Sequence, residues 1–90
     1  MNVWEIVILR IVESRGGRTD TQEIYRELES GEFITLEKEH LRETVHGGRP
    51  AYQHQVRSHL SNLCQAGHLR REGRGMYALT EKGLHRIKAM

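Results

Sequence analysis

Apolar side chains near the N-terminus recur with the period of an α-helix. They occupy positions i, i+3, i+4, i+7 and i+8, which together form one buried face; these are Trp4, Val7, Ile8, Ile11 and Val12. Glycines at positions 16 and 17 follow directly and are typical helix terminators. The pattern predicts a first helix that ends before these glycines.

The first helix carries further apolar side chains on its other side. Ile6 and Leu9 project there, so the helix must be covered on two sides. Leu84 and Ile87 lie at helical spacing near the C-terminus, and they favour cover from within the chain. The alternative is a homodimer in which a second copy docks on these same residues of the first and last helices.

A second helix follows a short extended segment at residues 18–19. Asp20 can cap this helix, and Glu23 three residues later completes the pattern of a capping box. Ile24, Tyr25 and Leu28 would face inward, and the helix is expected to end at residues 30–31.

The middle of the chain has a less regular apolar pattern. Thr35 can cap a short inserted helix that runs to about Thr44. Residues 46–50, His-Gly-Gly-Arg-Pro, then break the chain, and Pro50 suits the first turn of the next helix. We therefore predict a third main helix over residues 51–66.

The predicted helix 51–66 has an apolar stripe and a polar outer face. The stripe consists of Tyr52, Val56, Leu60 and Leu63, with Cys64 at its edge. The outer face contains no acidic residue; its members are His54, Ser58, Ser61 and Gln65, flanked by Gln55, Arg57 and Asn62. A polar, acid-free helix face suits contact with an anionic partner.

The C-terminal part predicts a β-hairpin and a last helix. Residues 68–72 and 76–80 form two short strands around Gly73-Arg74-Gly75, and Thr80 can start the last helix. Three helices, an inserted short helix, a two-stranded hairpin and a C-terminal helix form the element order of a winged helix-turn-helix. We expect a single α+β, mainly helical domain over residues 1–90, because a chain this short supports one small core.

Charge is segregated along the chain, although the net charge is only +2. Residues 1–45 contain six basic and ten acidic side chains, a net −4, whereas residues 46–90 contain eight basic and two acidic ones, a net +6. Five of the six histidines also lie in the second half. The asymmetry is typical of a nucleic-acid-binding face in the second half, and equally of a solvated charged surface with no partner; together with the winged-helix element order it predicts double-stranded DNA as the partner.

The residue types in the second half suit the two kinds of contact that proteins make with DNA. Gln53 or Gln55 could pair with adenine and Arg57 with guanine, while His54, Ser58, Ser61 and Asn62 share the same face of the helix that would enter the major groove. Arg70, Arg71 and Arg74 would contact phosphates or reach into a minor groove. Arg49, with the glycines before it, could hold a phosphate at the start of the helix.

The second half also resembles a known family. The similarity runs from Arg49-Pro50 through Tyr52, Val56, Leu63, Ala66-Gly67 and Leu69 to residues 73–83, Gly-Arg-Gly-Met-Tyr-Ala-Leu-Thr-Glu-Lys-Gly. This pattern resembles the N-terminal winged-helix domain of Mrr-type restriction endonucleases. The first half is also similar to that domain, with a helix, a Gly-Gly break, a second helix and an acidic insertion.

The resemblance implies a DNA-binding domain that directs a separate nuclease to its target. The sequence lacks the acidic pair followed by lysine that is typical of a nuclease centre, and 90 residues leave no room for a nuclease domain. We therefore expect no enzymatic activity. A stand-alone winged helix would act as a transcription regulator, or as a targeting module of a restriction or mobile-element system whose effector or nuclease is another chain.

Other chemistry finds little support in the sequence. The pairs His54/His59 and His40/His46 are not spaced to share one helical face, so we expect no metal and no cofactor. Cys64 suits a small apolar position and has no disulfide partner. Acidic residues at positions 37, 39 and 43 suit an exposed helix.

The apolar pattern also bears on membrane association and on cellular location. No run of 18 apolar residues occurs, and charged residues interrupt the N-terminal apolar stretch, so we expect no membrane association and a cytoplasmic protein. The alternative to DNA binding is a protein-interaction winged-helix module, a dimerisation or adaptor domain, which Ile6, Leu9 and the acidic first half would favour.

Overall fold

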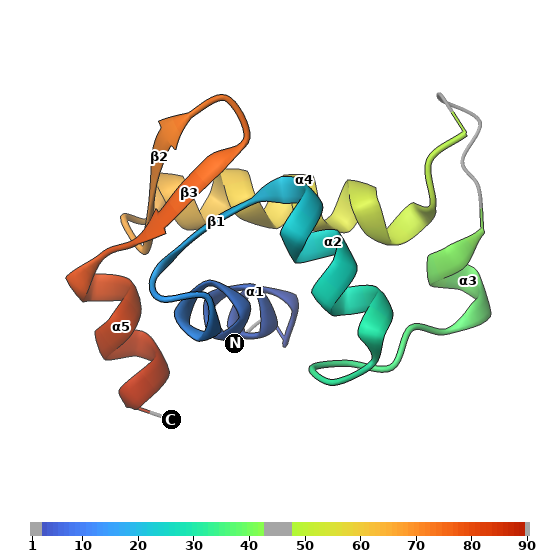
Figure 1. Cartoon of the computed structure of the whole chain (residues 1–90), viewed down its shortest axis with the longest axis horizontal. Helices are drawn as coiled ribbons and strands as arrows, with labels where there is room; N and C mark the ends of the chain where they lie inside the picture. Colours follow the sequence, from blue (N-terminus) through green and yellow to red (C-terminus); the bar gives the residue numbers. More distant parts are fainter. Residues whose placement is uncertain (1–2, 43–47, 90) are drawn as a thin grey trace.

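The computed structural model of the chain describes residues 3–42 and 48–89 (Figure 1). The elements run in the order α1 (Val3–Ser14), β1 (Arg18–Asp20), α2 (Thr21–Ser30), α3 (Lys38–Leu41), α4 (Ala51–Gln65), β2 (Leu69–Gly73), β3 (Met76–Leu79) and α5 (Glu81–Lys88). The predicted class, α+β and mainly helical, is confirmed. This order is consistent with a winged helix.

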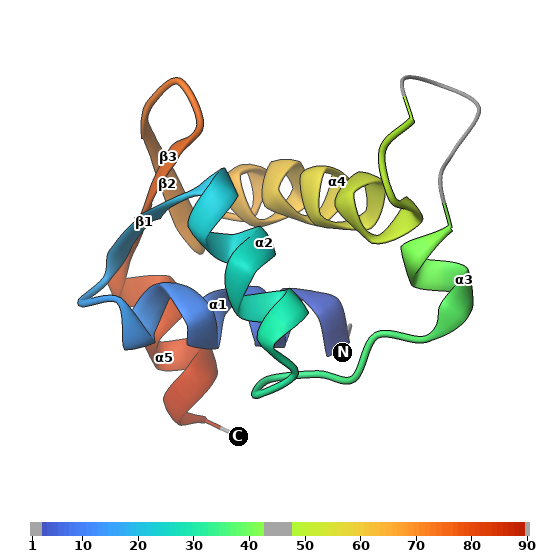
Figure 2. The same cartoon turned by 45° about the vertical axis from the view of Figure 1, so that its right-hand side comes forward.

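The helices pack around α1. It lies between α4 and α5, with α2 crossing beside it (Figures 1 and 2). The core combines the predicted stripe of α1 with that of α4, and its fully buried members include Ile8, Ile11, Val12, Ile24, Leu28, Tyr52, Val56, Leu60 and Leu63. Burial of this apolar surface is the main driving force for the fold.

The predicted two-sided cover of α1 comes from within the chain. Leu9 is fully buried and Ile87 is 5% exposed, and α5 packs directly against α1. Ile6 and Leu84 are half-buried. Leu9 and Ile87 are therefore not available for the predicted homodimer contact, because they are already buried within one copy; a homodimer through Ile6 and Leu84 stays a prediction.

The sheet has three antiparallel strands, whereas the sequence predicted a two-stranded hairpin. Residues 69–73 and 76–79 form the hairpin, and β1 adds to its other edge to give the order β1-β3-β2. Arg18 pairs with Ala78, and Thr19 with Tyr77. The extended segment at 18–19 was predicted, but its pairing joins residues about 60 positions apart, which local patterns do not reveal.

The start of α2 is fixed by the predicted cap. The Asp20 side chain accepts a hydrogen bond from the Glu23 backbone N–H at 2.8 Å. Gly31 ends the helix with φ of +80°, a conformation that favours glycine. The boundaries of α2 therefore follow from local sequence signals.

The inserted helix differs from its prediction. We expected it from Thr35 to about Thr44, but α3 spans only Lys38–Leu41, and Thr44 lies outside the described residues. The Glu37 backbone N–H donates to Nδ1 of His40 at 2.9 Å, so the cap forms two residues after Thr35. The predicted contributions of His46 and Gly47 also lie outside the described residues.

A close contact joins α5 to the start of β2. The Thr80 hydroxyl caps α5 by accepting from the Gly83 N–H at 3.1 Å. A Cβ on residue 83 would lie 2.2 Å from the His68 carbonyl oxygen, so only glycine fits there. This contact explains the glycine of the Thr-Glu-Lys-Gly stretch as a packing requirement between helix and hairpin.

Candidate nucleic-acid interface

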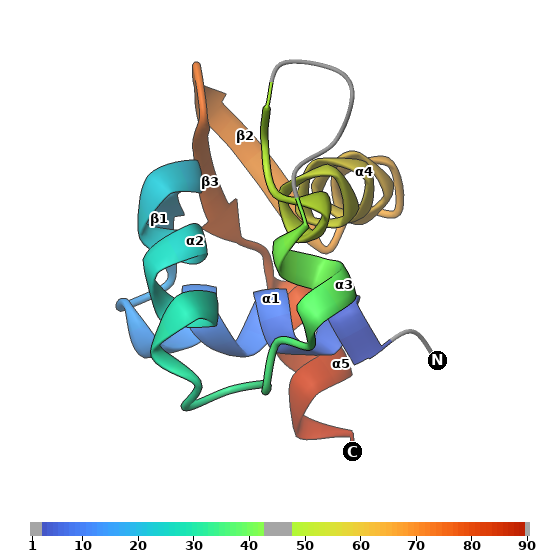
Figure 3. The ribbon, with the colours of Figure 1, turned by 90° about the vertical axis from the view of Figure 1, so that its right-hand side faces the viewer.

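A groove of about 580 Å³ separates α4 from the hairpin, and the first half of α2 forms one end of it. Viewed nearly along α4, the hairpin and α2 stand on the same side of this helix (Figure 3). Its lining is made of neutral and basic side chains; it consists of Thr21, Gln22, Tyr25, Arg49, Gln53, Arg57, Leu60, Ser61, Cys64, Gln65, Arg71, Arg74, Gly75 and Tyr77. An anionic ligand would therefore meet no carboxylate in the groove.

Four exposed arginines line the groove, two from each side. Arg49 lies just before α4 and Arg57 in the middle of that helix, and Arg71 and Arg74 come from β2 and the hairpin turn. Within residues 3–42 and 48–89, none of the four forms an ion pair with a carboxylate, in contrast to the ion pairs made by Arg15, Arg18, Arg26, Arg70 and Arg86. Four unneutralised cations around one concave surface form a focused positive field.

The candidate residues predicted on α4 divide into three sets. Gln53, Arg57 and Ser61 are spaced four apart and line the groove. His54 and Ser58 are exposed and lie further around the helix, on the side opposite Val56. Gln55 and Asn62 are exposed on the flank away from the groove. The predicted outer face of α4 is therefore exposed, but only part of it faces the hairpin.

Two consecutive arginines on β2 point to opposite faces of the sheet. Arg71 pairs with Tyr77, and both line the groove. Arg70 pairs with Ala78, which also pairs with Arg18, so Arg18 and Arg70 share the other face. Successive side chains of a strand alternate between faces, which places one arginine of this pair in the groove and the other behind it.

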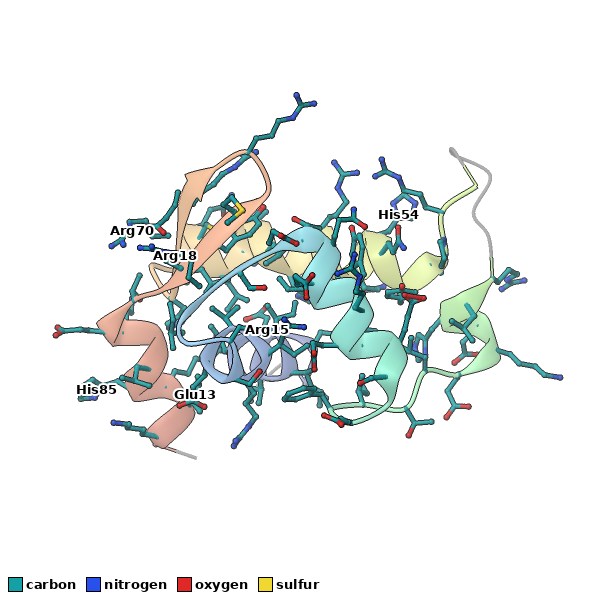
Figure 4. The ribbon with its side chains drawn as sticks, in the orientation of Figure 1. Glu13, Arg15, Arg18, His54, Arg70 and His85 are labelled. Carbon is teal, nitrogen blue, oxygen red and sulfur yellow. The ribbon has the colours of Figure 1, made fainter. Side chains whose placement is uncertain are left out.

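Arg70 is engaged by a carboxylate on that outer face. Its guanidinium lies 2.9 Å from Oε2 of Glu72, and Arg18 binds Oε1 of the same carboxylate at 2.5 Å. The hydrogen bond from Arg70, followed by the charge of Arg18, lowers the pKa of Glu72. Figure 4 shows Arg18 and Arg70 together beside the hairpin, far from His54 on the N-terminal half of α4. The structure thus does not bring Arg70 to the groove with the other two predicted hairpin arginines, Arg71 and Arg74.

The floor of the groove is neutral and partly apolar. Tyr25, almost fully buried, packs edge-on against Tyr52 with ring centroids 5.9 Å apart. Burial raises the pKa of Tyr25, with a smaller opposing effect from Arg57. Burial likewise raises the pKa of the Cys64 thiol, which Arg71 partly offsets. These groups stay uncharged at neutral pH, so the charge in the groove comes from its arginines.

The hairpin turn is fastened to the start of α2. Both the backbone N–H and the hydroxyl of Thr21 donate to the Gly75 carbonyl, at 3.0 and 3.2 Å. This contact holds the turn that carries Arg74 against α2. Thr21 and Gln22 were not among the predicted site residues, because nothing in their local sequence indicates that a hairpin 50 residues later reaches them.

A second polar cluster, also missed by the sequence, lies among α1, α4 and α5. The Glu5 carboxylate binds His59 Nδ1 through Oε2 and Arg86 through Oε1, each at 3.1 Å. The same Arg86 guanidinium lies 3.2 Å from His68 Nδ1. The side chains of Glu5, His59 and Arg86 are 17%, 11% and 18% exposed, so this cluster ties the helices together below the surface.

No three His, Cys, Asp or Glu side chains among residues 3–42 and 48–89 gather so that they could hold a metal ion. None of the helices in these ranges has the length and apolar character needed to span a membrane.

Comparison with known proteins gives one match. The family model of the Mrr N-terminal domain matches residues 4–89, nearly the whole chain. No curated protein and no solved structure matches the chain significantly.

Proposed function

This chain belongs to the Mrr N-terminal domain family, and we propose that it binds duplex DNA through the groove between α4 and the hairpin. The family indicates a DNA-binding winged-helix module of restriction systems, and the domain is the non-catalytic part of Mrr-type proteins. The observation that carries the proposal is the convergence of Arg49, Arg57, Arg71 and Arg74 on one acid-free groove.

In this proposal α4 enters the major groove, which is wide enough for an α-helix. The polar side chains on its exposed side then face base edges, and the hairpin contacts the neighbouring backbone. Phosphate contacts from the arginines supply most of the affinity and fix the position of α4 on the duplex. In this proposal His54 and Ser58, on the exposed side of α4, take part in base recognition.

The biological role that follows is DNA targeting without chemistry. We propose that the chain has no catalytic residue. It acts either as a transcription regulator or as the targeting module that brings an effector or nuclease on another chain to DNA. A cytoplasmic location fits both roles. The protein-interaction alternative named Ile6, Leu9 and the acidic first half; Leu9 is buried within the chain, whereas Ile6 is half-buried.

A salt titration of DNA binding tests the proposal. Anisotropy of a labelled duplex of random sequence is measured with the full chain at several salt concentrations. Because each phosphate contact on B-DNA contributes about −0.9 to the slope of log K against log salt, four arginines predict a slope of about −4. No binding to any duplex, or binding that does not depend on salt, would contradict the proposal.

The matched control removes cations outside the groove. Arg15 and Arg26 lie on the α1–α2 side and are paired with Glu23 and Glu27. The double variant R15A/R26A lowers the net charge by two but leaves the groove intact, so its salt slope should equal that of the unmodified chain.

A further inference from the structure

We propose that one sugar–phosphate strand of the duplex runs along the groove over Cys64, and that Arg57 contacts this backbone rather than a base. The inference rests on the proposed function and specifies the path of the DNA across the same site. It assigns Arg57 differently from the guanine contact that its helix position suggested.

The first argument is the arrangement of charge on the two sides of the groove. Arg57 faces the groove from α4 and Arg71 from β2, and Cys64 of α4 is also part of the lining. Arg49 and Arg74 extend the two sides. A strand of phosphates that lies between the two sides can contact arginines on both of them. The edge of one guanine, in contrast, can pair with only one arginine.

The second argument is the position of Arg57 around α4. At 100° per residue, Arg57 is turned about 100° from Val56 toward the hairpin, while His54 and Ser58 are turned about 160° from Val56 on either side of the outermost line of the helix. Side chains on that outermost line penetrate deepest into a major groove. Base recognition therefore falls to His54 and Ser58, and Arg57 lies at the level of the backbone.

The third argument is the character and rigidity of the groove. Its floor holds Leu60, Cys64 and Tyr77, neutral groups that suit the apolar faces of deoxyribose. The two hydrogen bonds from Thr21 to the Gly75 carbonyl fix the hairpin turn. The turn that carries Arg74 is thus held against α2 before DNA binds, so little ordering of the turn is needed when the strand enters.

Cys64 provides a native probe for this path, because it is the only cysteine in the sequence. Alkylation by iodoacetamide is followed by mass spectrometry with and without a duplex of random sequence. Mildly alkaline buffer is used, because burial raises the pKa of the thiol. With free duplex at about ten times its Kd, only the unbound fraction reacts, and alkylation of Cys64 should slow by about eleven-fold.

The control moves the cysteine away from the groove. In the variant C64S/S30C, the thiol lies at the exposed C-terminal end of α2, away from the α2 residues that line the groove. Its alkylation rate should be the same with and without duplex. Protection of both thiols would overturn the inference, because it would show a general effect of DNA rather than a strand over Cys64.

Variants of α4 test the assignment of Arg57 independently. R57A should weaken binding to every sequence alike, lower the magnitude of the salt slope by about 0.9, and leave the sequences selected from a random pool unchanged. H54A should change the selected sequences and keep the slope. Relaxed preference at one base position in R57A with an unchanged slope would overturn the backbone assignment.

The outcomes separate this inference from the proposed function. Salt-dependent binding with an unprotected Cys64 would overturn the strand path while leaving DNA binding intact. Absence of binding to any duplex would overturn both.

Discussion

The two sides of α4 use arginine and histidine in opposite ways. On one side, Arg57 faces the groove together with three other arginines, and no carboxylate lines the groove. On the other side, His59 and Arg86 share the Glu5 carboxylate, and these side chains are at least 82% buried. Arg57 and His59 are only two positions apart on α4. Arg57 lies in a groove that no carboxylate lines, whereas His59 lies in a cluster that contains its own carboxylate, Glu5.

The difference follows from solvation. An exposed cation keeps its water and can exchange counterions for phosphates, so its attraction remains available to a ligand. A cation withdrawn from water needs a partner within the protein, because burying an unpaired charge is costly. A paired and largely buried cation such as Arg86 therefore holds this fold together, whereas the groove arginines, which form no ion pair within the described residues, are those that we propose bind DNA.

The largest effect on duplex affinity is expected when all four groove arginines are replaced by alanine. In R49A/R57A/R71A/R74A, the loss of four phosphate contacts at 0.1 M salt should weaken duplex binding by about 10³ to 10⁴-fold, since each contact contributes about 0.9 to the slope. The free energy of unfolding should not fall, because none of the four arginines is in an ion pair within the described residues. Anisotropy and urea denaturation measure the two quantities. An equal loss in R15A/R26A would remove the distinction between groove and paired arginines.

A change in the cluster of Glu5, His59 and Arg86 should lower stability and leave DNA affinity unchanged, the opposite of the groove variant. E5Q keeps the size of the side chain but leaves Arg86 and His59 without their carboxylate. The free energy of unfolding should fall by about 1 to 3 kcal/mol, and the melting temperature by about 4 to 8 °C per kcal/mol for a domain of this size. Fluorescence of Trp4, the only tryptophan, can follow unfolding in urea. Duplex affinity measured well below the transition should stay within about two-fold; a larger loss at full folding would show that the cluster acts on the groove.

Much of this division could be predicted from local sequence. The apolar periods of α1 and α4, the Asp20 cap and the hairpin turn are encoded within a few residues, and the structure confirms them. Most of the groove lining comes from residues 46–90, the half with net positive charge, and DNA binding by this half stays a prediction. Five of the seven charged and amide residues that line the groove were predicted as site residues: Arg49, Gln53, Arg57, Arg71 and Arg74. Gln65 was recognised only as part of the outer face of the helix, and Gln22 was missed.

The failures concern contacts between distant segments. His59 falls between Val56 and Leu60 on the buried side of α4, but its partner Glu5 lies 54 residues away. Pairing of β1 with β3 and the contact of Thr21 with Gly75 are equally non-local. Arg70 is different, because the alternation of side chains along a strand already implies that Arg70 and Arg71 face opposite ways.

Arg70 and Arg71 therefore provide a matched pair with the same chemistry, neighbouring positions and opposite faces. R71A removes a groove arginine and should weaken duplex binding about eight-fold at 0.1 M salt, which corresponds to one phosphate contact. R70A removes a side chain already bound to Glu72 on the outer face, and its affinity should change by less than about two-fold. Anisotropy with one labelled duplex suffices for both. Equal losses would show that the face of the sheet does not decide which arginine meets DNA.

The smallest effect is expected from His68, at the edge of the second cluster. Burial, followed by the positive charges of Arg86 and Lys82, lowers the pKa of His68, and its neutral Nδ1 can accept from Arg86. Unfolding releases His68 to its ordinary pKa of about 6.5, so the unfolded chain binds more protons between that value and the lower pKa of the folded chain. The stabilisation by neutral His68 is therefore present above about pH 6.5 and is lost as the pH falls through the folded-state pKa. H68Q keeps a hydrogen-bond acceptor but cannot titrate, so the loss of stability between about pH 7.5 and 5.5 should be smaller in H68Q than in the unmodified chain. Urea denaturation at both pH values gives the difference; identical pH dependence in the two proteins would show that proton uptake by His68 does not destabilise the cluster.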